Sequence, residues 1–536
     1  MKNILYKTVI MMSFSLLMGC EDILNTEPVN NLNRSTFWLS QKDAEYSLNG
    51  IYGYLPDYTE IYLDKVTDIA FENLGLSHFS TIEKSEHNSE TAYFNTQWDA
   101  SYRCIRAVNF FLENSDNILE NDPTYSEELN ARFRAEARFI RSFQYLRLAM
   151  FFGDVPLVIN TLDVNQAVEL TRTPVDQIWD FISSELTEVA NILPSGYSDP
   201  NDKGRVTKGA ALALKARAML CAERYTEAAT AARQVMDLNV YSLYPDYAEL
   251  FSYEGQGNSE VIFDHQYSKD IFSYPFYQQN GPLGINAQGN MAVTRNLVDA
   301  YPTVNGLPIT MDNTYNEFDP YRNRDPRLAA TVYLPAFSDD IPGDMLDDGS
   351  EDFDPRPGSG TTDEINVDYQ RTKTGFGVRK YLQEEDYTDR TNCGTNFILI
   401  RYADVLLIYA EAMLEANQID ESVYEALDEV RGRVGFPPLA RGQSVEGLRQ
   451  IIRNERMVEF GLEGLRLFDI RRWRIAEDVM TGTIPGFRYI APGESNITEY
   501  DYPGVVRVFD PVRDYLWPIP FSEITLNPNL SQNDGY

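Results

Sequence analysis

The chain has 536 residues, of which 43% are apolar and 12% aromatic, enough for a large buried core. Its 46 basic and 81 acidic residues give a formal net charge of −35, which disfavours nucleic acid as a partner because phosphates would be repelled. The three histidines and four cysteines lack the short, regular spacing of a zinc site, and they indicate no disulfide framework.

The N-terminal segment has the pattern of a secretory signal. Lys2 and Lys7 precede a short apolar run, and Gly19 stands directly before Cys20. A transmembrane helix would need about 20 apolar residues, more than this run supplies. The ending Leu-Met-Gly-Cys resembles a bacterial lipobox, which implies a signal peptide over 1–19 and acylation of Cys20 at its thiol and its new amino terminus.

Residues 20–40 are predicted to form a lipid-anchored tether. Glu21 and Asp22 resemble the acidic signal that directs Bacteroidetes lipoproteins to the cell surface. Beyond the tether, apolar residues recur at helical spacing in many segments. They predict helices near 41–55, 98–119, 126–152, 174–193, 209–236, 401–417, 423–435 and 444–475.

The alanine-rich segment 209–236 predicts two helices separated by a short turn near Glu223. Its "RYTEA" turn resembles the core of a tetratricopeptide repeat (TPR), with Ala216 and Ala228 at the two small-residue positions. A similar pair of helices is expected within 401–435. Such recurring pairs favour a helical scaffold.

The domain prediction follows from these changes along the chain. Gly, Pro, Asn, Asp and Tyr dominate the middle of the chain, which favours long structured loops, and binding sites tend to lie on such loops. The predicted units are a helical TPR-like scaffold at 41–255 with an aromatic loop region at 73–98, a loop-rich ligand-binding insertion at 256–396, a second helical TPR-like scaffold at 397–480, and an extended C-terminal region at 481–536.

Seven segments in order resemble the SusD/RagB family of outer-membrane nutrient-binding lipoproteins of Bacteroidetes, and together they span nearly the whole chain. They are "GCEDIL", "RAEARFIRSFQYLRLAMFFGDVPLV", "RVTKGAALALKARAML", "RDPRL", "ILIRYADVLLIYAEA", "IIRNERMVEFGLEGLRLFDIRRW" and "LWPIP…NPNLSQNDGY". The resemblance implies a mainly α fold, in which TPR-like helix-turn-helix pairs pack against a large irregular loop-rich lobe.

The resemblance also implies a function. Such proteins bind a glycan at the cell surface, hand it to a SusC-like TonB-dependent transporter and act as a lid over that barrel. We therefore expect an outer-membrane lipoprotein, lipid-anchored and facing the exterior, with a glycan ligand, a SusC-like partner, no cofactor and no catalysis. Three alternatives stay open: peptide or other nutrient cargo on the same architecture, a helical scaffold that binds protein only, and a lipid-anchored glycoside hydrolase.

A sugar site needs aromatic rings against which the C–H faces of the sugar pack, and polar groups that bond its hydroxyls. The resemblance implies that two aromatic regions, 73–98 and 273–290, correspond to loops that line the glycan site in the family. The candidate ligand-binding residues are Phe79, Tyr93, Tyr274 and Tyr277, with Asn73 and Asn290 as polar partners. For each ring, packing inside the protein is the competing interpretation.

No motif marks a catalytic pair of carboxylates, although 81 acidic residues guarantee that some lie close together. The acidic run 339–354 departs from an EF-hand at Leu346 and Pro355, so a solvated loop without metal is expected. The arginines near 134–141 and 453–459 alternate with acids, which predicts ion-pair networks.

Overall fold

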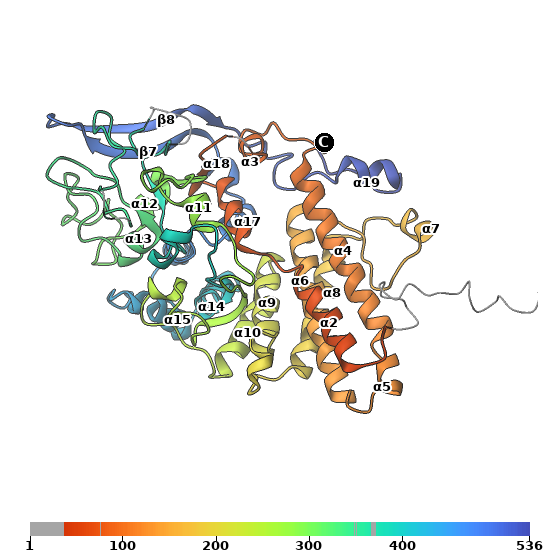
Figure 1. Ribbon diagram of the computed structural model, residues 1–536. Helices are drawn as coiled ribbons and strands as arrows, with labels where there is room; N and C mark the ends of the chain where they lie inside the picture. Colours follow the sequence, from red (N-terminus) through yellow and green to blue (C-terminus); the bar gives the residue numbers. More distant parts are fainter. Residues whose placement is uncertain (1–36, 76, 348, 350, 366–370) are drawn as a thin grey trace, which may run out of the picture.

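The computed structural model describes residues 37–75, 77–347, 349, 351–365 and 371–536. The predicted signal peptide, Cys20 and the tether up to residue 36 lie outside these described residues. A helical scaffold forms one side of the molecule and an irregular lobe the other, and a long β-hairpin runs along the top of the lobe (Figure 1).

The scaffold helices lie close to the predicted positions. They are α2 (Gln41–Tyr52), α4 (Ala92–Asn114), α5 (Asn117–Asn121), α6 (Glu127–Phe152), α8 (Val175–Ile192), α9 (Lys208–Cys221), α10 (Tyr225–Asp237), α14 (Tyr402–Glu415), α15 (Glu421–Arg433), α16 (Val445–Glu459) and α17 (Arg466–Arg472). They pack in chain order: α4 on α6, α6 on α8, α8 on α9, α9 on α10 and α10 on α14. The predicted mainly α fold is confirmed.

Local sequence signals set the ends of these helices. The Ser126 hydroxyl accepts a hydrogen bond from the Leu129 N–H at 3.1 Å and so caps the start of α6. The helix ends at Gly153, whose φ of 72° is a conformation that glycine adopts without strain. The predicted TPR-like pair is present as α9 and α10, and Ala216 and Ala228 are fully buried. Side chains this small allow two packed helices to approach closely.

The lobe consists of short elements joined by long loops. Its two-stranded sheets are all antiparallel: β1 (Ala70–Glu72) with β3 (Met291–Val293), β2 (Val261–His265) with β6 (Phe397–Arg401), β4 (Val332–Tyr333) with β5 (Gly377–Val378), and β7 (Gly482–Ile490) with β8 (Ile497–Arg507). Its short α-helices, with those beside the scaffold, are α3 (Phe79–Ile82), α7 (Val164–Ala167), α11 (Phe276–Asn280), α12 (Arg295–Ala300), α13 (Pro326–Thr331), α18 (Ala476–Val479) and α19 (Phe521–Leu526).

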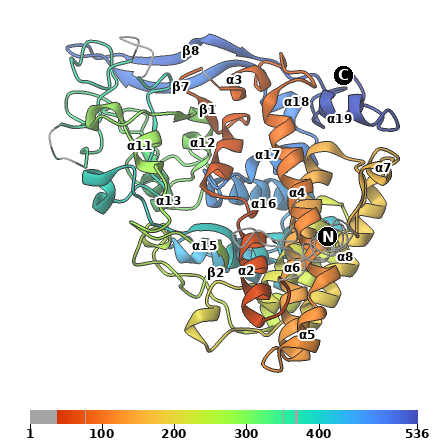
Figure 2. The ribbon, with the colours of Figure 1, turned by 45° about the vertical axis from the view of Figure 1, so that its right-hand side comes forward.

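The region predicted as extended, 481–536, begins with the β7–β8 hairpin, which Figures 1 and 2 show along the upper edge of the molecule. The turn between its strands includes Pro492 and Gly493, and Gly493 has a φ of 76°. Pro-Gly is a common turn dipeptide, so the sequence carries a signal for this hairpin.

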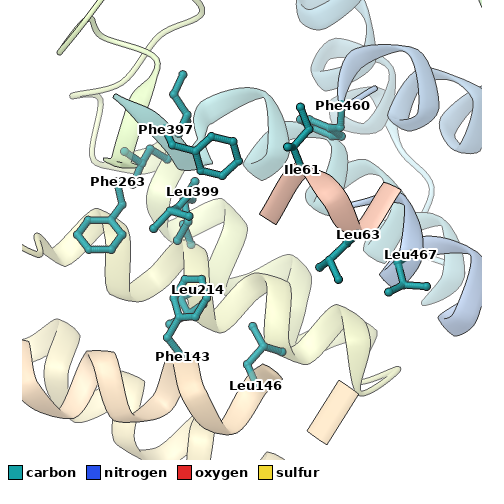
Figure 3. Close-up of a cluster of buried hydrophobic side chains, with 14 of the residues drawn as sticks. Ile61, Leu63, Phe143, Leu146, Leu214, Phe263, Phe397, Leu399, Phe460 and Leu467 are labelled. Carbon is teal, nitrogen blue, oxygen red and sulfur yellow. The ribbon is translucent and has the colours of Figure 1, made fainter. Parts of the chain in front are cut away.

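Scaffold and lobe share one hydrophobic core (Figure 3). Phe143 and Leu146 of α6 and Leu214 of α9 meet Phe263 of β2 and Leu399 of β6. Ile61 and Leu63, from the 3₁₀ helix η1 (Tyr58–Lys65), lie in the same cluster near Phe460 and Leu467. The lobe is therefore held by the same buried apolar surface as the helices.

Buried charges also join the two parts. We define the central ion network as Arg327, Lys380, Arg401, Arg433, Glu260, Glu455, Glu459 and Glu463. Arg401, at the end of β6, donates to three glutamates of this network at 2.5 to 2.9 Å. Burial alone would raise the pKa of Glu459, but the guanidinium groups of Arg433, Arg401 and Arg327 hold it well below its ordinary value.

The arginine-rich part of α6 behaves in the same way. Arg138 and Arg141 both pair with Glu185 of α8, at 2.6 Å in each case. In the last helical block, Arg456 pairs with Asp404 and Asp469. The prediction that these clusters form ion-pair networks is confirmed.

We call residues 508–536 the C-terminal strap. The strap crosses the ends of α4 and α6 and is fixed by side-chain amides that bond to backbone carbonyls. The Asn533 amide donates to the carbonyls of Phe152 and Trp517 at 3.0 and 2.7 Å, and the Asn527 amide donates to Leu170 at 2.8 Å. These bonds explain the many asparagines in this part of the sequence, because they satisfy carbonyl groups that have no partner in a helix or sheet.

His87 lies beneath the strap and is 3% exposed, with its Nε2 2.6 Å from the Tyr536 hydroxyl. Burial lowers the pKa of His87 to about 4, although the Asp514 carboxylate acts in the opposite direction. In the unfolded chain the pKa would be about 6.5. Between these two values the unfolded chain binds a proton that the folded protein excludes, so His87 lowers stability as the pH falls from about 6.5 to about 4.

Replacing His87 by glutamine should therefore remove this part of the acid sensitivity. The variant should be less stable than the natural chain near pH 7.5, and the gap should shrink by roughly 2–3 kcal/mol at pH 4.5. Urea unfolding of both proteins at the two pH values measures the gap. Groups common to both proteins, such as Glu83, whose pKa burial raises to about 7, cancel in this difference. An equal gap at both pH values would contradict the prediction.

Candidate ligand-binding groove

The structure brings the two predicted aromatic regions together. Because β1 pairs with β3, the Asn73 N–H donates to the Asn290 carbonyl at 3.1 Å. The Asn73 side chain is 3% exposed and bonds to the backbone of Gly289, Arg371 and Lys373 at 2.8 to 3.1 Å. Asn73 thus ties its own loop to two others, at 289–290 and 371–373, and Asn290 is half-buried at the same crossing.

The predicted rings of the second region lie inside the lobe. Tyr277 has no exposed surface, and its hydroxyl donates to the Asp347 carboxylate. Tyr274 is 3% exposed and its hydroxyl donates to the Thr395 carbonyl at 2.7 Å. The structure therefore differs from the prediction that these two rings present faces to a ligand. Both follow a chain reversal that turns them toward the core.

The rings of the first region pack beneath the C-terminal strap. Phe79 is buried and lies 5.0 Å from Tyr93, measured between ring centroids. Tyr93 is half-buried and stacks on His78 at 4.5 Å, with Trp517 at 5.5 Å on another side. These neighbours cover much of the two rings. In this structure Phe79 and Tyr93 therefore pack against other side chains, as the competing interpretation has it.

A ladder of four rings leads from the core to the surface of the lobe. It consists of His265, Tyr267, Phe272 and Tyr274. Tyr267 lies 4.3 Å from buried Tyr274 and stacks on Phe272 at 5.2 Å, with 11° between the two planes. His265 stacks on Tyr267 at 4.8 Å. Phe272 is 56% exposed, so the ring ladder presents an aromatic face to solvent.

A tight reversal of the chain creates this stacking. Ser268 and Phe272 exchange two backbone hydrogen bonds of 2.9 Å, and Asp270 has a φ of 65°. Aspartate is among the few residues that adopt this left-handed conformation readily. The reversal sets Phe272 beside Tyr267 and leaves Ile271, which is 86% exposed, at the tip.

The ring ladder borders a groove of about 400 Å³. The groove lies between α2, the loop before α9 and the end of β2. Its lining residues are Asn49, Tyr52, Gly53, Leu55, Asn201, Lys203, Gly204, Arg205, Asp264, His265, Gln266 and Phe272. It thus combines aromatic rings with amides and charged groups, which is the composition that a sugar site requires.

His265 contributes a polar atom as well as a ring. Its Nδ1 lies 3.1 Å from the Pro56 carbonyl, and a carbonyl oxygen only accepts, so the hydrogen is assigned to Nδ1. Burial lowers the pKa of His265, so the ring is neutral near pH 7 and Nε2 is a hydrogen-bond acceptor.

Three other hollows among the described residues lack such a platform. The core cavity beside Arg147 and Phe397 has a volume of only about 60 Å³, too small for a sugar. A hollow of about 550 Å³ between α4, α6 and α8 is lined by the Arg138, Arg141 and Glu185 pairs and no exposed ring ladder. In a third, of about 410 Å³, the guanidinium groups of Arg453 and Arg472 cover the Trp473 ring.

The sequence analysis missed His265, Tyr267 and Phe272. A signal for them is present in "HQYSKDIFSY", where aromatic residues flank a polar turn as in a hairpin. Alternation of that kind does not say which ring is exposed. The predicted residue Tyr274 belongs to the same ladder but forms its buried base.

Within the part of the chain that the structure describes, no three His, Cys, Asp or Glu side chains are grouped as ligands for a metal ion. Of the helices in this part, none is both long and apolar enough to cross a membrane.

The fold is mainly α, with TPR-like helix pairs packed against an irregular lobe that carries the groove. Residues 259–536 match the family model described as SusD family, and residues 24–220 match one described as "Starch-binding associating with outer membrane". The chain therefore belongs to the SusD family.

Similar proteins span almost the whole chain. The SusD-like protein P25 of Formosa agariphila is 25% identical over 554 residues, which cover 99% of this chain and 98% of that protein. The starch-binding protein SusD of Bacteroides thetaiotaomicron is 26% identical over 507 residues, covering 87% and 82%. The crystal structure of a SusD-like carbohydrate-binding protein from Bacteroides fragilis has a TM-score of 0.82 and 31% identity, covering 92% of this chain and all of that chain.

Proposed function

We propose that this protein binds an oligosaccharide reversibly at the ring-ladder groove and delivers it to a SusC-like TonB-dependent transporter. The observation that carries the binding half is the exposed Phe272 face, stacked on Tyr267 and His265 beside a groove lined by amides and charged groups. Apolar sugar faces pack against such rings while the polar groups bond the hydroxyls.

The relatives support this proposal. One is named a starch-binding protein, another is called a SusD-like carbohydrate-binding protein, and one family model carries the outer membrane in its description. In the proposal the chain is held at the outer membrane, facing the exterior, by acyl chains on Cys20.

The protein is proposed to release its ligand unchanged. Glycoside hydrolysis uses two carboxyl groups about 5–9.5 Å apart across the bond that is cut. Asp264 is the only carboxylic acid among the described residues that line the groove. It is 8% exposed, and its Oδ2 accepts a hydrogen bond from the Asn396 amide at 2.8 Å.

The residues predicted from the sequence have roles in this proposal. Tyr274 forms the buried base of the ring ladder, and the Tyr277 N–H bonds to Cys393, which pairs with Tyr274 through the backbone; Asn73 holds loops elsewhere in the lobe. Direct contact of Phe79, Tyr93 or Asn290 with a ligand stays a prediction. If those residues bind the sugar and the groove does not, alanine at Tyr93 will weaken binding while alanine at Phe272 leaves it unchanged.

Replacing Phe272 by alanine should weaken oligosaccharide binding about tenfold, which corresponds to about 1.4 kcal/mol, because the exposed stacking face is lost. Isothermal titration of the mature chain against a panel of defined oligosaccharides measures the change. Phe521→Ala is the matched control, since that ring is 53% exposed on α19 and does not line the groove. Equal affinities of the Phe272→Ala variant and the natural chain would contradict the site.

The delivery half is tested separately. In cells that also produce the transporter, the Phe272→Ala variant should still co-purify with it, because the exposed ring is proposed to contact sugar. If the protein forms a product from any oligosaccharide of the panel, and replacing a single carboxylate abolishes this activity, the protein is a hydrolase and the proposal is wrong.

A further inference from the structure

The groove contains a lysine that pairs with no acidic side chain among the described residues. The chain has 81 acidic and 46 basic residues, so most cations are expected to have an acidic partner. Lys203 lines the groove and is exposed, and among the described residues its ammonium group forms no ion pair and no hydrogen bond.

The other charges near Lys203 balance one another. Arg205 pairs with Glu136 and Asp202 at 3.1 and 3.0 Å, and Arg132 pairs with Asp202 at 2.7 Å. Two arginines therefore face two acids. Glu136 and Asp202 are both paired with arginine. Lys203 therefore remains available to bind an anion from solution.

Asp264, the remaining charged group of the groove, forms no ion pair with Lys203 among the described residues. Asp264 is 8% exposed, and its Oδ2 accepts a hydrogen bond from the Asn396 amide at 2.8 Å. Asp264 is the only acid that lines the groove among the described residues. The groove lining thus holds two basic side chains, Lys203 and Arg205, and one acidic side chain, in a chain where acids outnumber bases 81 to 46.

The loop that carries Lys203 is held firmly against the ladder strand. Lys203 follows the 3₁₀ helix η2 (Pro200–Asp202), and its N–H donates to Pro200 at 3.3 Å. Gly204 has a φ of 84°, and a Cβ on it would lie 2.3 Å from the Gln266 side-chain nitrogen. The loop therefore lies directly on Gln266, one residue after His265 of the ring ladder, and fixes Lys203 at the same groove.

We propose that the groove selects anionic oligosaccharides, with Lys203 binding a carboxylate or sulfate group of a sugar whose ring packs on Phe272. This inference rests on the proposed function and names its substrate class. Lys203 acts as a specificity residue, since neutral sugars of the same shape would keep the ring contact and lose the charge contact.

The test uses matched pairs of sugars. Oligogalacturonate is compared with the same oligosaccharide after methyl esterification, and a sulfated galactan oligosaccharide with its desulfated form, by isothermal titration of the mature chain. The anionic member of at least one pair should bind more tightly, and its affinity should fall as sodium chloride is raised. The pair that shows the preference identifies the anion as carboxylate or sulfate.

Lys203→Gln should weaken binding of the preferred anionic sugar about fivefold and leave its neutral counterpart unchanged. Lys208→Gln, which alters a lysine outside the groove lining at the start of α9, is the matched control and should change neither. Tight binding of neutral sugars with no anionic preference would overturn this inference while the proposed function stands. If none of the sugars binds, both this inference and the proposed function are overturned.

Discussion

Replacing Arg401 by methionine should lower the free energy of unfolding by about 3–5 kcal/mol, because it leaves buried glutamates without their partner. Arg401 is 1% exposed and contacts Glu260, Glu459 and Glu463. Methionine fills a similar volume but supplies no donor. Urea unfolding near pH 7, followed by circular dichroism, measures the loss.

Arg103→Met is the matched control for this variant. Arg103 also pairs with an acid, Asp99, at 2.9 Å, but its side chain is 68% exposed. Exposed pairs contribute at most about 1 kcal/mol, so this change should shift the midpoint only slightly. Equal losses in the two variants would mean that burial does not decide the strength of the central ion network.

Trp517→Ala should cost about 3–5 kcal/mol, as expected when a large buried ring is removed and a cavity remains. Trp517 is fully buried and stacks on Phe151 at 4.2 Å with 20° between the planes, and Phe94 lies at 5.1 Å. The backbone N–H of Trp517 also donates to the Phe151 carbonyl at 2.6 Å. The alanine variant keeps this hydrogen bond, so the loss measures the side chain alone.

The Trp517 variant is compared with Phe521→Ala, four residues along the same strap. Because Phe521 is 53% exposed, its loss should change stability by no more than about 0.5 kcal/mol. The rate of cleavage by a protease within 508–536 should rise for Trp517→Ala alone. A Trp517 variant as stable as the natural chain would show that the strap contributes little to the fold.

Helix positions could be predicted because their signals are local. Ser126 and Gly153 lie at the two ends of α6, within one residue of the predicted bounds, and the turn at Glu223 separates α9 from α10 as expected. Each of these signals depends on backbone geometry within a few residues, so the sequence alone contains them.

The groove could be predicted only in part, because exposure is a property of the whole fold. Tyr274 and Phe272 are two residues apart and belong to one ladder, yet one is 3% and the other 56% exposed. Lys203 reaches the groove from a loop more than sixty positions before Phe272. Neither fact follows from spacing, since both depend on how β2 packs against the loop before α9.

The contacts between distant parts of the chain have a consequence for the order of folding. The Arg466 guanidinium binds Asp68 across 398 positions, and the Arg507 guanidinium binds the Ala70 carbonyl across 437. A ribosome adds residues one after another, so these two contacts of segment 64–90 can form only after more than 370 later residues have been made. Closing such long loops is slow, and the early segment is exposed to aggregation and proteolysis in the interval. Chaperones that bind this segment during synthesis would therefore raise the yield of folded protein.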